Sequence, residues 1–320
     1  MAHTTVTVWS GAGRVSEHSI CYHSAARKKT HYEKYALVTC ILLLLLIMVQ
    51  SAISFVRPAF SSPKLLASES ETAAPSGKPN SPSIVPITVQ EPKPPVDTIS
   101  PRLQTLLEEW EKAHPERKWA VTVQGLDTST FNASINAQSS YRSASIYKLY
   151  LTYALFQKET PESLKAKPEL AKCVELMLRI SDNPCAESVA NYVGWAGTDR
   201  AISAIGINNT HLARTEGPVS TAADTATLLK GLNDGSLYSS ASRSVVMDIL
   251  KKQTWRKGIP AGCSGCTVYN KTGDLSFVRH DAAIIETPKL KYTLVIFTDG
   301  ASYAEIAQLT KQINDSLNQP

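Results

Sequence analysis

The stretch Ser143-Ala-Ser-Ile-Tyr-Lys-Leu-Tyr-Leu151 carries a serine and a lysine three positions apart, Ser145 and Lys148. In a helix this spacing places both side chains on one face, one turn apart. Lys148 could then deprotonate or orient Ser145, which is how a serine nucleophile is activated. The pattern is weak by itself, because an ordinary polar helix start has the same residues and Ser61-Ser-Pro-Lys64 repeats it within a proline-rich segment.

Two further short motifs follow the serine and lysine pair. Ser181-Asp-Asn183 lies between two helical patterns, where by itself it is typical of a capped turn. Lys271-Thr-Gly273 ends an apolar strand-like run, where Gly273 permits close approach to the strand edge, although the motif alone favours a strand-end turn. Together, in the order SxxK, SDN and KTG, the three motifs are the signature of penicillin-recognising serine enzymes. They provide the nucleophile, base, second hydroxyl and cation that acyl transfer needs.

The sequence around these motifs resembles the class A β-lactamase family over nearly all of residues 101–320. The similar stretches include the nucleophile helix, the SDN loop with its following helix, the helix after the omega loop, and the last strands: SASIYKLYL, ISDNPCAESVANYV, STAADTATLLKGL, GIPAGCSGCTVYNKTG and KYTLVIFTDG. The resemblance implies a serine hydrolase of β-lactams, with antibiotic resistance as its expected role. Its ligand would be a β-lactam or a peptidoglycan peptide.

The resemblance also assigns roles to single residues. Ser145 would be the acylated nucleophile and Lys148 its proton relay, while Ser181 would pass a proton to the leaving nitrogen. The backbone N–H groups of Ser145 and Asp274 would form the oxyanion hole, and loss of one such donor typically slows acyl transfer about 100–1,000-fold.

The remaining implied residues bind the substrate. Asn183 would hold its amide side chain, and Lys271, Thr272 and Gly273 would line its carboxylate site. Arg279, eight positions after Lys271, falls near a carboxylate-binding arginine of many family members. An exposed strand arginine explains Arg279 equally well.

One stretch departs from the family pattern. Class A members place a catalytic glutamate on an omega loop, in an ExxLN motif. In Leu212–Val219, Arg214 and Glu216 resemble the residues that open this loop, but the Leu-Asn pair is missing and only four residues separate Glu216 from Thr221. Glu216 either still reaches the hydrolytic water or is a solvated carboxylate. Acylation is therefore expected, whereas fast deacylation is left open.

The order of the elements predicts an α+β fold. A helix should begin at Ser100-Pro101, because Ser100 can cap it and Pro101 suits its first position. Strands at both ends of the domain, with a helical block between them, predict an antiparallel sheet packed against a mostly helical subdomain. The expected helices are 145–158, 168–179, 185–195, 198–204, 221–232, 240–252 and 302–317, and the expected strands are 119–126, 129–135, 267–271, 278–286 and 292–298.

Upstream of residue 101 the composition changes twice. Residues 36–56 are almost wholly apolar and carry no charged side chain, and the run is long enough for a transmembrane helix. Basic residues precede this run, which favours an inside N-terminus for residues 1–35. A cleaved signal peptide is the alternative. Ten prolines between residues 57 and 101 indicate an extended extracytoplasmic linker over 57–100. We therefore expect a single-pass protein of the cell membrane with an extracytoplasmic domain at 101–320.

Four cysteines fall in the predicted extracytoplasmic part: Cys173, Cys185, Cys263 and Cys266. An even number there indicates disulfides. Local pairs are the simplest arrangement, but the other two connectivities stay open. Cys263-Ser-Gly-Cys266 has the spacing of a redox or zinc pair, but it lacks the additional Cys or His ligands of a zinc site, so no metal is expected. No organic cofactor is expected either, because the Ser-Lys chemistry needs none.

The net charge of +5 is too small to indicate nucleic-acid binding. We also expect the protein to be a monomer. Three functions remain. The leading one is a class A β-lactamase. The closest alternative is a D-alanyl-D-alanine carboxypeptidase or related cell-wall acyl hydrolase, which uses the same residues. The third, a β-lactam sensor that stays acylated, is not an enzyme.

Overall fold

The computed structural model describes residues 97–128 and 130–319. The predicted cytoplasmic tail, the predicted transmembrane helix and nearly all of the predicted linker lie outside these residues. Within the described ranges, none of the helices combines the length and the apolar character that crossing a bilayer requires.

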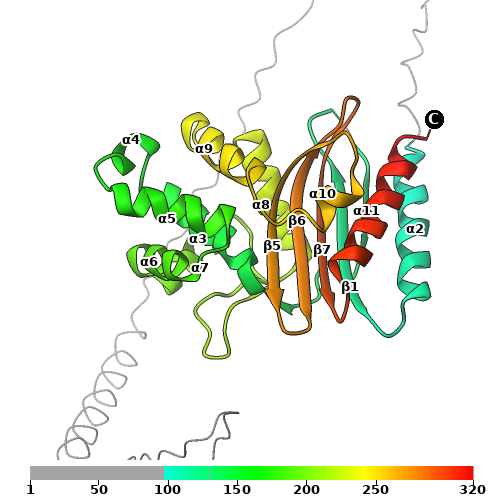
Figure 1. The fold of residues 1–320 in the computed structure, drawn as a ribbon, viewed down its shortest axis with the longest axis horizontal. Coiled ribbons are helices and arrows are strands. Elements are labelled where there is room, and N and C mark those ends of the chain that lie inside the picture. Colours follow the sequence, from blue (N-terminus) through cyan, green and yellow to red (C-terminus); the bar gives the residue numbers. More distant parts are fainter. Residues whose placement is uncertain (1–96, 129, 320) are drawn as a thin grey trace, which may run out of the picture. The chain divides into compact units, whose positions relative to one another are not determined.

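The centre of the fold is a five-stranded antiparallel sheet in the order β2-β1-β7-β6-β5 (Figure 1). Its strands are β1 (Lys118–Gly125), β2 (Asn132–Ile135), β5 (Thr267–Leu275), β6 (Val278–Glu286) and β7 (Lys291–Asp299). Strand β1 pairs with β7 along its whole length, from Lys118 opposite Asp299 to Gly125 opposite Tyr292. Both ends of the domain therefore build one sheet, as the sequence predicts.

One face of this sheet is covered by α2 (Ile99–Ala113), α10 (Ile259–Gly262) and α11 (Tyr303–Leu317). Helix α2 buries Leu103, Leu107 and Trp110, which recur at helical spacing and pack on Trp119 and the sheet. Helix α11 begins with a capping box in which Ser302 and Glu305 satisfy each other's backbone N–H groups.

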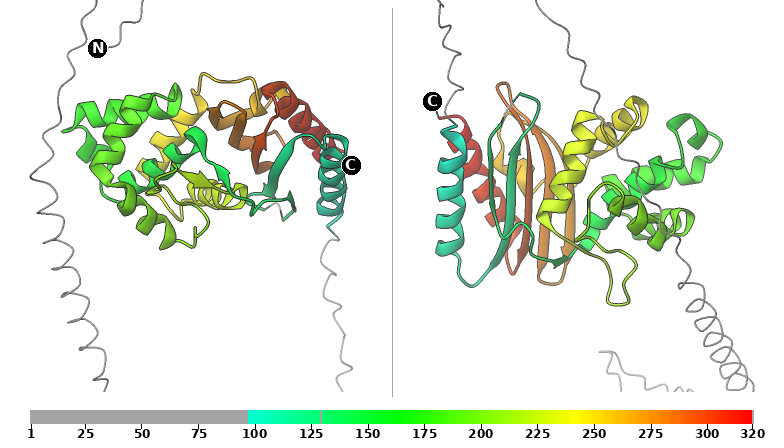
Figure 2. Two further views of the ribbon diagram at one scale, coloured as in Figure 1. Left: turned by 90° about the horizontal axis from the view of Figure 1, so that it is seen from below. Right: turned by 180° about the vertical axis from the view of Figure 1, so that it is seen from behind.

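The other face carries the helical subdomain (Figure 2). Its helices are α3 (Tyr147–Phe156), α4 (Pro161–Leu164), α5 (Pro168–Arg179), α6 (Asn183–Val193), α7 (Trp195–Ser203), α8 (Ala222–Asp234) and α9 (Ser240–Lys251). Helix α3 is surrounded on all sides, because every residue from Lys148 to Phe156 is buried. The α+β architecture with a helical subdomain beside the sheet is thus confirmed.

Several predicted boundaries are wrong by a few residues, for local reasons. Helix α6 begins at Asn183 rather than 185, because the Asp182 carboxylate accepts a hydrogen bond from the Cys185 N–H and so caps the helix. Helix α3 begins at Tyr147, since residues Ala144–Ile146 form a 3₁₀ turn.

Two small features link these layers. Strands β3 (Tyr141–Arg142) and β4 (Val219–Ser220) form a two-stranded sheet directly before the 3₁₀ turn. Disulfides join Cys173 to Cys185, between α5 and α6, and Cys263 to Cys266, between α10 and β5. The structure thereby selects the local connectivity.

Candidate active site

Ser145 lies half-buried on the 3₁₀ turn Ala144–Ile146. The residue before it, Ala144, has a φ of 46°, a left-handed conformation that is uncommon for a residue with a side chain. Neighbouring segments hold this turn: the Ser143 N–H donates to the Pro218 carbonyl, and the buried His280 ring lies 2.9 Å from the Arg142 carbonyl through Nε2. Ser145 is therefore presented from a constrained turn.

Gly273 brings strand β5 against the same turn. A Cβ at this position would lie 3.0 Å from the Ala144 Cβ and 3.1 Å from both the Ile146 Cγ1 and the Ser143 carbonyl oxygen. Only a residue without a side chain fits at this distance without displacing its neighbours. The contact places Ser145 and Asp274 on adjacent segments, as an oxyanion hole formed by their N–H groups requires.

Ser181 connects the two motif lysines. Its Oγ accepts a hydrogen bond from the Lys271 Nζ at 2.9 Å and lies 3.3 Å from the Lys148 Nζ, which also donates to the Ser181 carbonyl. Ser181 has a φ of 64°, another left-handed residue with a side chain. Such conformations persist where surrounding contacts enforce them, and they are concentrated at functional sites.

Lys148 is fully buried at the start of α3 and donates a 2.7 Å hydrogen bond to the Asn183 Oδ1. Burial disfavours its charged form and lowers its pKa to about 8, against an opposing effect of the nearby Asp182 carboxylate. About one tenth of the Lys148 amine is therefore neutral at pH 7 and about half at pH 8, and a neutral amine can accept a proton.

Lys271 is fully buried as well and also donates to the Thr272 carbonyl at 2.7 Å. Burial lowers its pKa well below the ordinary lysine value, and the positive charge of Lys148 lowers it further. The carboxylate of Asp281 acts in the opposite direction.

The structure thus brings together Lys148, Ser181, Asn183 and Lys271 directly, and places Gly273 against the Ser145 turn. In the described part of the chain, Ser145 and Lys148 share no hydrogen bond. Catalytic hydrogen bonds are often long before substrate binds, and they tighten in the complex.

Arg279 and Glu216 are less closely associated with the site. The Arg279 guanidinium lies on the β5–β6 turn, where it donates to the Ser276 carbonyl at 2.9 Å and lies 3.3 Å from the Asp274 carboxylate. The Glu216 side chain is 76% exposed and forms an ion pair with Arg214 at 3.4 Å. Within the described residues Glu216 forms no hydrogen bond with Ser145 or Lys148, so its exposure favours a solvated carboxylate.

Sequence reasoning missed His280 and Asp281, two fully buried polar residues on β6. Burial lowers the pKa of His280 to about 4, so its ring is neutral near neutral pH. The Thr298 N–H can then donate to Nδ1, while Nε2–H donates to Arg142. The available signal was a pair of polar residues inside an otherwise apolar strand.

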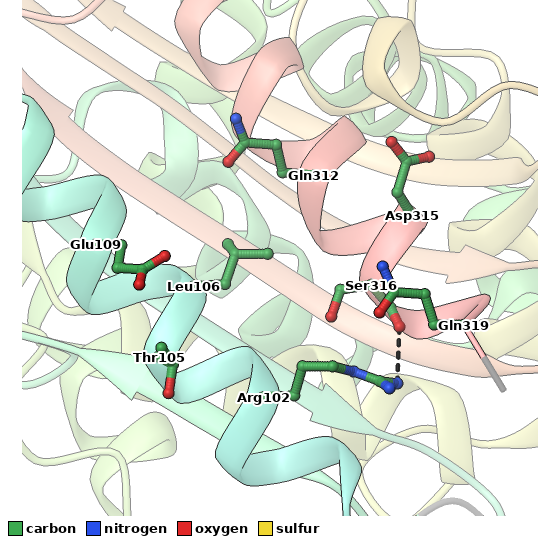
Figure 3. Close-up of a pocket in the computed structure, with 8 residues that line it drawn as sticks. All are labelled: Arg102, Thr105, Leu106, Glu109, Gln312, Asp315, Ser316 and Gln319. Atoms are coloured by element: carbon green, nitrogen blue, oxygen red, sulfur yellow. Dashed lines mark hydrogen bonds between the residues drawn. The ribbon is translucent and has the colours of Figure 1, made fainter.

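Ser145 is not among the lining residues of two surface cavities. One, of about 570 Å³, runs between α2 and α11, where Arg102 donates to the Ser316 carbonyl (Figure 3). The other, of about 440 Å³, is lined in part by Tyr141 and Arg142. Across the described ranges, no group of three or more His, Cys, Asp or Glu side chains is arranged to hold a metal ion.

Comparisons with known proteins identify the family and the fold of this chain. Residues 159–319 match the beta-lactamase enzyme family. No curated protein matches the chain.

Among solved structures, the chain is similar to the TLA-3 extended-spectrum β-lactamase, with a TM-score of 0.62 and 20% identity over 68% of this chain and 100% of that one. It is also similar to a variant of PBP-A solved as an acyl-enzyme complex with penicillin G, with a TM-score of 0.61 and 20% identity over 68% and 96% of the two chains. A class A β-lactamase from Bacteroides cellulosilyticus gives a TM-score of 0.59 and 18% identity over 68% and 98%. These likenesses establish the fold.

Proposed function

Because this chain belongs to the beta-lactamase enzyme family, we propose that it is a serine hydrolase that opens β-lactam rings through an acyl-enzyme on Ser145. The observation that carries this proposal is the position of Ser181, whose hydroxyl contacts the amines of both Lys148 and Lys271. One hydroxyl is thereby linked to a candidate base and to a candidate carboxylate-binding cation.

The proposed reaction begins with neutral Lys148 accepting the proton of Ser145, whose Oγ attacks the lactam carbonyl carbon. The N–H groups of Ser145 and Asp274 stabilise the oxyanion. Collapse of the intermediate breaks the C–N bond and Ser181 passes its proton to the departing nitrogen. The Lys148 ammonium then returns a proton to Ser181, whose Oγ lies 3.3 Å from the Lys148 Nζ. Water then cleaves the ester and returns the enzyme to its starting state. Lys271 and Thr272 bind the substrate carboxylate throughout, and Asn183 holds the amide side chain.

A second candidate is a D-alanyl-D-alanine carboxypeptidase, and the exposed Glu216 favours it. This reaction uses the same acyl-enzyme and does not depend on an omega-loop glutamate. The membrane-anchored, extracytoplasmic location suggested by residues 36–56 suits both candidates, because both substrates are found outside the cytoplasmic membrane. We include this location in the proposal, and its test is whether the full chain stays in the membrane fraction after alkaline carbonate washing.

The test of the function uses the full-length chain purified in a mild detergent, with a fluorescent penicillin and a chromogenic cephalosporin. Covalent labelling and turnover that are lost in Ser145→Ala support the proposal. Ser61→Ala is the matched control, because Ser61 has the same spacing to a lysine. Labelling that persists in Ser145→Ala would overturn the mechanism.

The rate of label release separates the candidates. Rapid turnover identifies the β-lactamase. A long-lived label with release of D-alanine from a pentapeptide identifies the carboxypeptidase, and a long-lived label with neither activity identifies a sensor. Glu216→Gln should leave the lifetime of the acyl-enzyme within about twofold, because an exposed side chain away from the ester contributes little. A much longer lifetime would instead show that Glu216 assists deacylation.

A further inference from the structure

The candidate site contains two amines and no carboxylate bonded to either. The amines of Lys148 and Lys271 both contact the Ser181 hydroxyl, and within the described residues neither lysine forms an ion pair. Two positive charges this close disfavour each other. Each amine is supported by one carboxylate at longer range, since Asp182 favours the charged form of Lys148 and Asp281 favours that of Lys271.

Asp281 is a fully buried acid on β6 that the proposed mechanism does not use. It lies opposite Thr272 in the strand register and accepts hydrogen bonds from the Asn270 Nδ2 at 2.9 Å and from the Ile259 N–H at 2.9 Å. The chain before α10 closes over it, because a Cβ at Gly258 would lie 2.5 Å from its Oδ2. A buried carboxylate is costly unless nearby groups compensate its charge.

The groups that act on Asp281 come from each element around it. On β5 these are Asn270 and Lys271. From the loop before α10, the Arg256 guanidinium donates to the Asn270 Oδ1 at 3.2 Å. From α11, Tyr303 lies near Asp281, and the tyrosine pKa is raised first by burial and second by the Asp281 charge. Burial raises the pKa of Asp281 to about 7, so its negative charge is present above that pH, where buried Lys271 most readily loses its proton.

We propose that Asp281 is a positioning residue for substrate recognition: acting from the α10–α11 side of the sheet, its charge keeps Lys271 protonated so that Lys271 can bind an anionic acyl donor. The proposal rests on the proposed function, in which Lys271 binds the substrate carboxylate. The hydrogen bonds through Asn270 hold strand β5 in the register that this electrostatic support requires.

The experiment compares benzylpenicillin with its methyl ester, which lacks the carboxylate, as acylating agents of the full-length chain. In Asp281→Asn, acylation by benzylpenicillin should fall about tenfold relative to acylation by the ester, the effect of one pKa unit in the lysine. The fall should grow as the pH rises, because Lys271 without its counter-charge loses its proton at lower pH. A merely structural defect would slow both reagents equally. Asp315→Asn is the control, since Asp315 is an exposed acid paired with Lys311 on α11.

A second variant guards against a folding defect. Asn270→Asp combined with Asp281→Asn exchanges the amide and the carboxylate, keeps the pair, and places the charge on the residue beside Lys271. This variant should restore the wild-type preference for the carboxylate-bearing reagent. The proposal is wrong if Asp281→Asn and the exchange variant both show the wild-type ratio of acylation rates for benzylpenicillin and its methyl ester. It is also wrong if the exchange variant folds but does not restore the preference for benzylpenicillin. Failure of the wild type to react with benzylpenicillin would instead refute the proposed function.

Discussion

The Oγ of Ser181 lies 2.9 Å from the Nζ of Lys271 and 3.3 Å from the Nζ of Lys148, so a single hydroxyl joins the nucleophile helix to the KTG strand. Replacing Ser181 by alanine removes the link and leaves the amines without a shared acceptor. We expect Ser181→Ala to slow penicillin acylation about 100-fold, the size of a typical general acid–base contribution. Stopped-flow labelling measures this rate.

The control for that variant is Ser188→Ala, because the hydrogen bond that the Ser188 hydroxyl on α6 donates goes to the carbonyl of Pro184 within its own helix. It should react at the wild-type rate. Equal rates for Ser181→Ala and wild type would remove Ser181 from the mechanism.

The lowered pKa of Lys148 predicts the pH dependence of acylation. The amine is neutral above about pH 8, and only the neutral amine accepts the Ser145 proton, so the acylation rate should rise as the pH increases through about 8. Asp182→Asn should move this rise to lower pH, because the Asp182 charge raises the pKa of Lys148. The pH profile of labelling tests both expectations, and a profile that is flat from neutral to alkaline pH would exclude Lys148 as the base.

Gly273→Ala should slow acylation about tenfold, because the added methyl would meet the Ser145 turn at 3.0–3.1 Å and shift it by a few tenths of an ångström. Gly197→Ala is the control, since its Cβ would meet only the end of the Arg200 side chain, at 3.9 Å. The ratio of labelling rates, with thermal unfolding measured in parallel, distinguishes displacement of the turn from loss of folded protein. Unchanged labelling in Gly273→Ala would show that the turn tolerates the displacement.

The disulfides predict different outcomes for two double variants. Cys173→Ser with Cys185→Ser opens a loop of sequence separation 12 that contains Ser181, which should cost roughly 3 kcal/mol of unfolding free energy in the chain-entropy model. It should also slow acylation, because Ser181 then loses part of the support for its left-handed conformation.

Cys263→Ser with Cys266→Ser opens a loop of sequence separation 3, which should lower the free energy of unfolding by roughly 2 kcal/mol. The acylation rate should change little. Urea unfolding and labelling rates test both pairs. Equal acylation rates for the two double variants would show that the disulfide between Cys173 and Cys185 does not support the candidate site.

Much of the fold is predictable because it depends on local patterns. Helix α2 follows from the spacing of Leu103, Leu107 and Trp110, and α11 from the helical pattern over residues 302–317. The motif residues are recognisable because their chemistry requires particular side chains at particular spacings. The pairing of β1 with β7 follows from strands at both ends of the domain.

The rest depends on contacts between distant residues. No pattern along the chain indicates that Lys148 and Lys271 share one acceptor, because Lys271 is separated from Ser181 by 90 positions. Asp281 carries no motif, and its importance appears only when its burial and neighbours are known. For Glu216 the shortened loop raised the question, and the exposure of its side chain gives the answer that the structure favours.

The hydrogen bond between Arg102 and Ser316 joins the first turn of α2 to the last turn of α11. The two ends of the described domain therefore leave it side by side, and Figure 1 shows both helices across the sheet from α3, α5 and α6. A short linker between these ends would allow the chain to be circularly permuted with new termini in an exposed loop. Attaching the described domain to a solid support through residue 97 or residue 319 would likewise leave the Ser145 side free for bulky reagents.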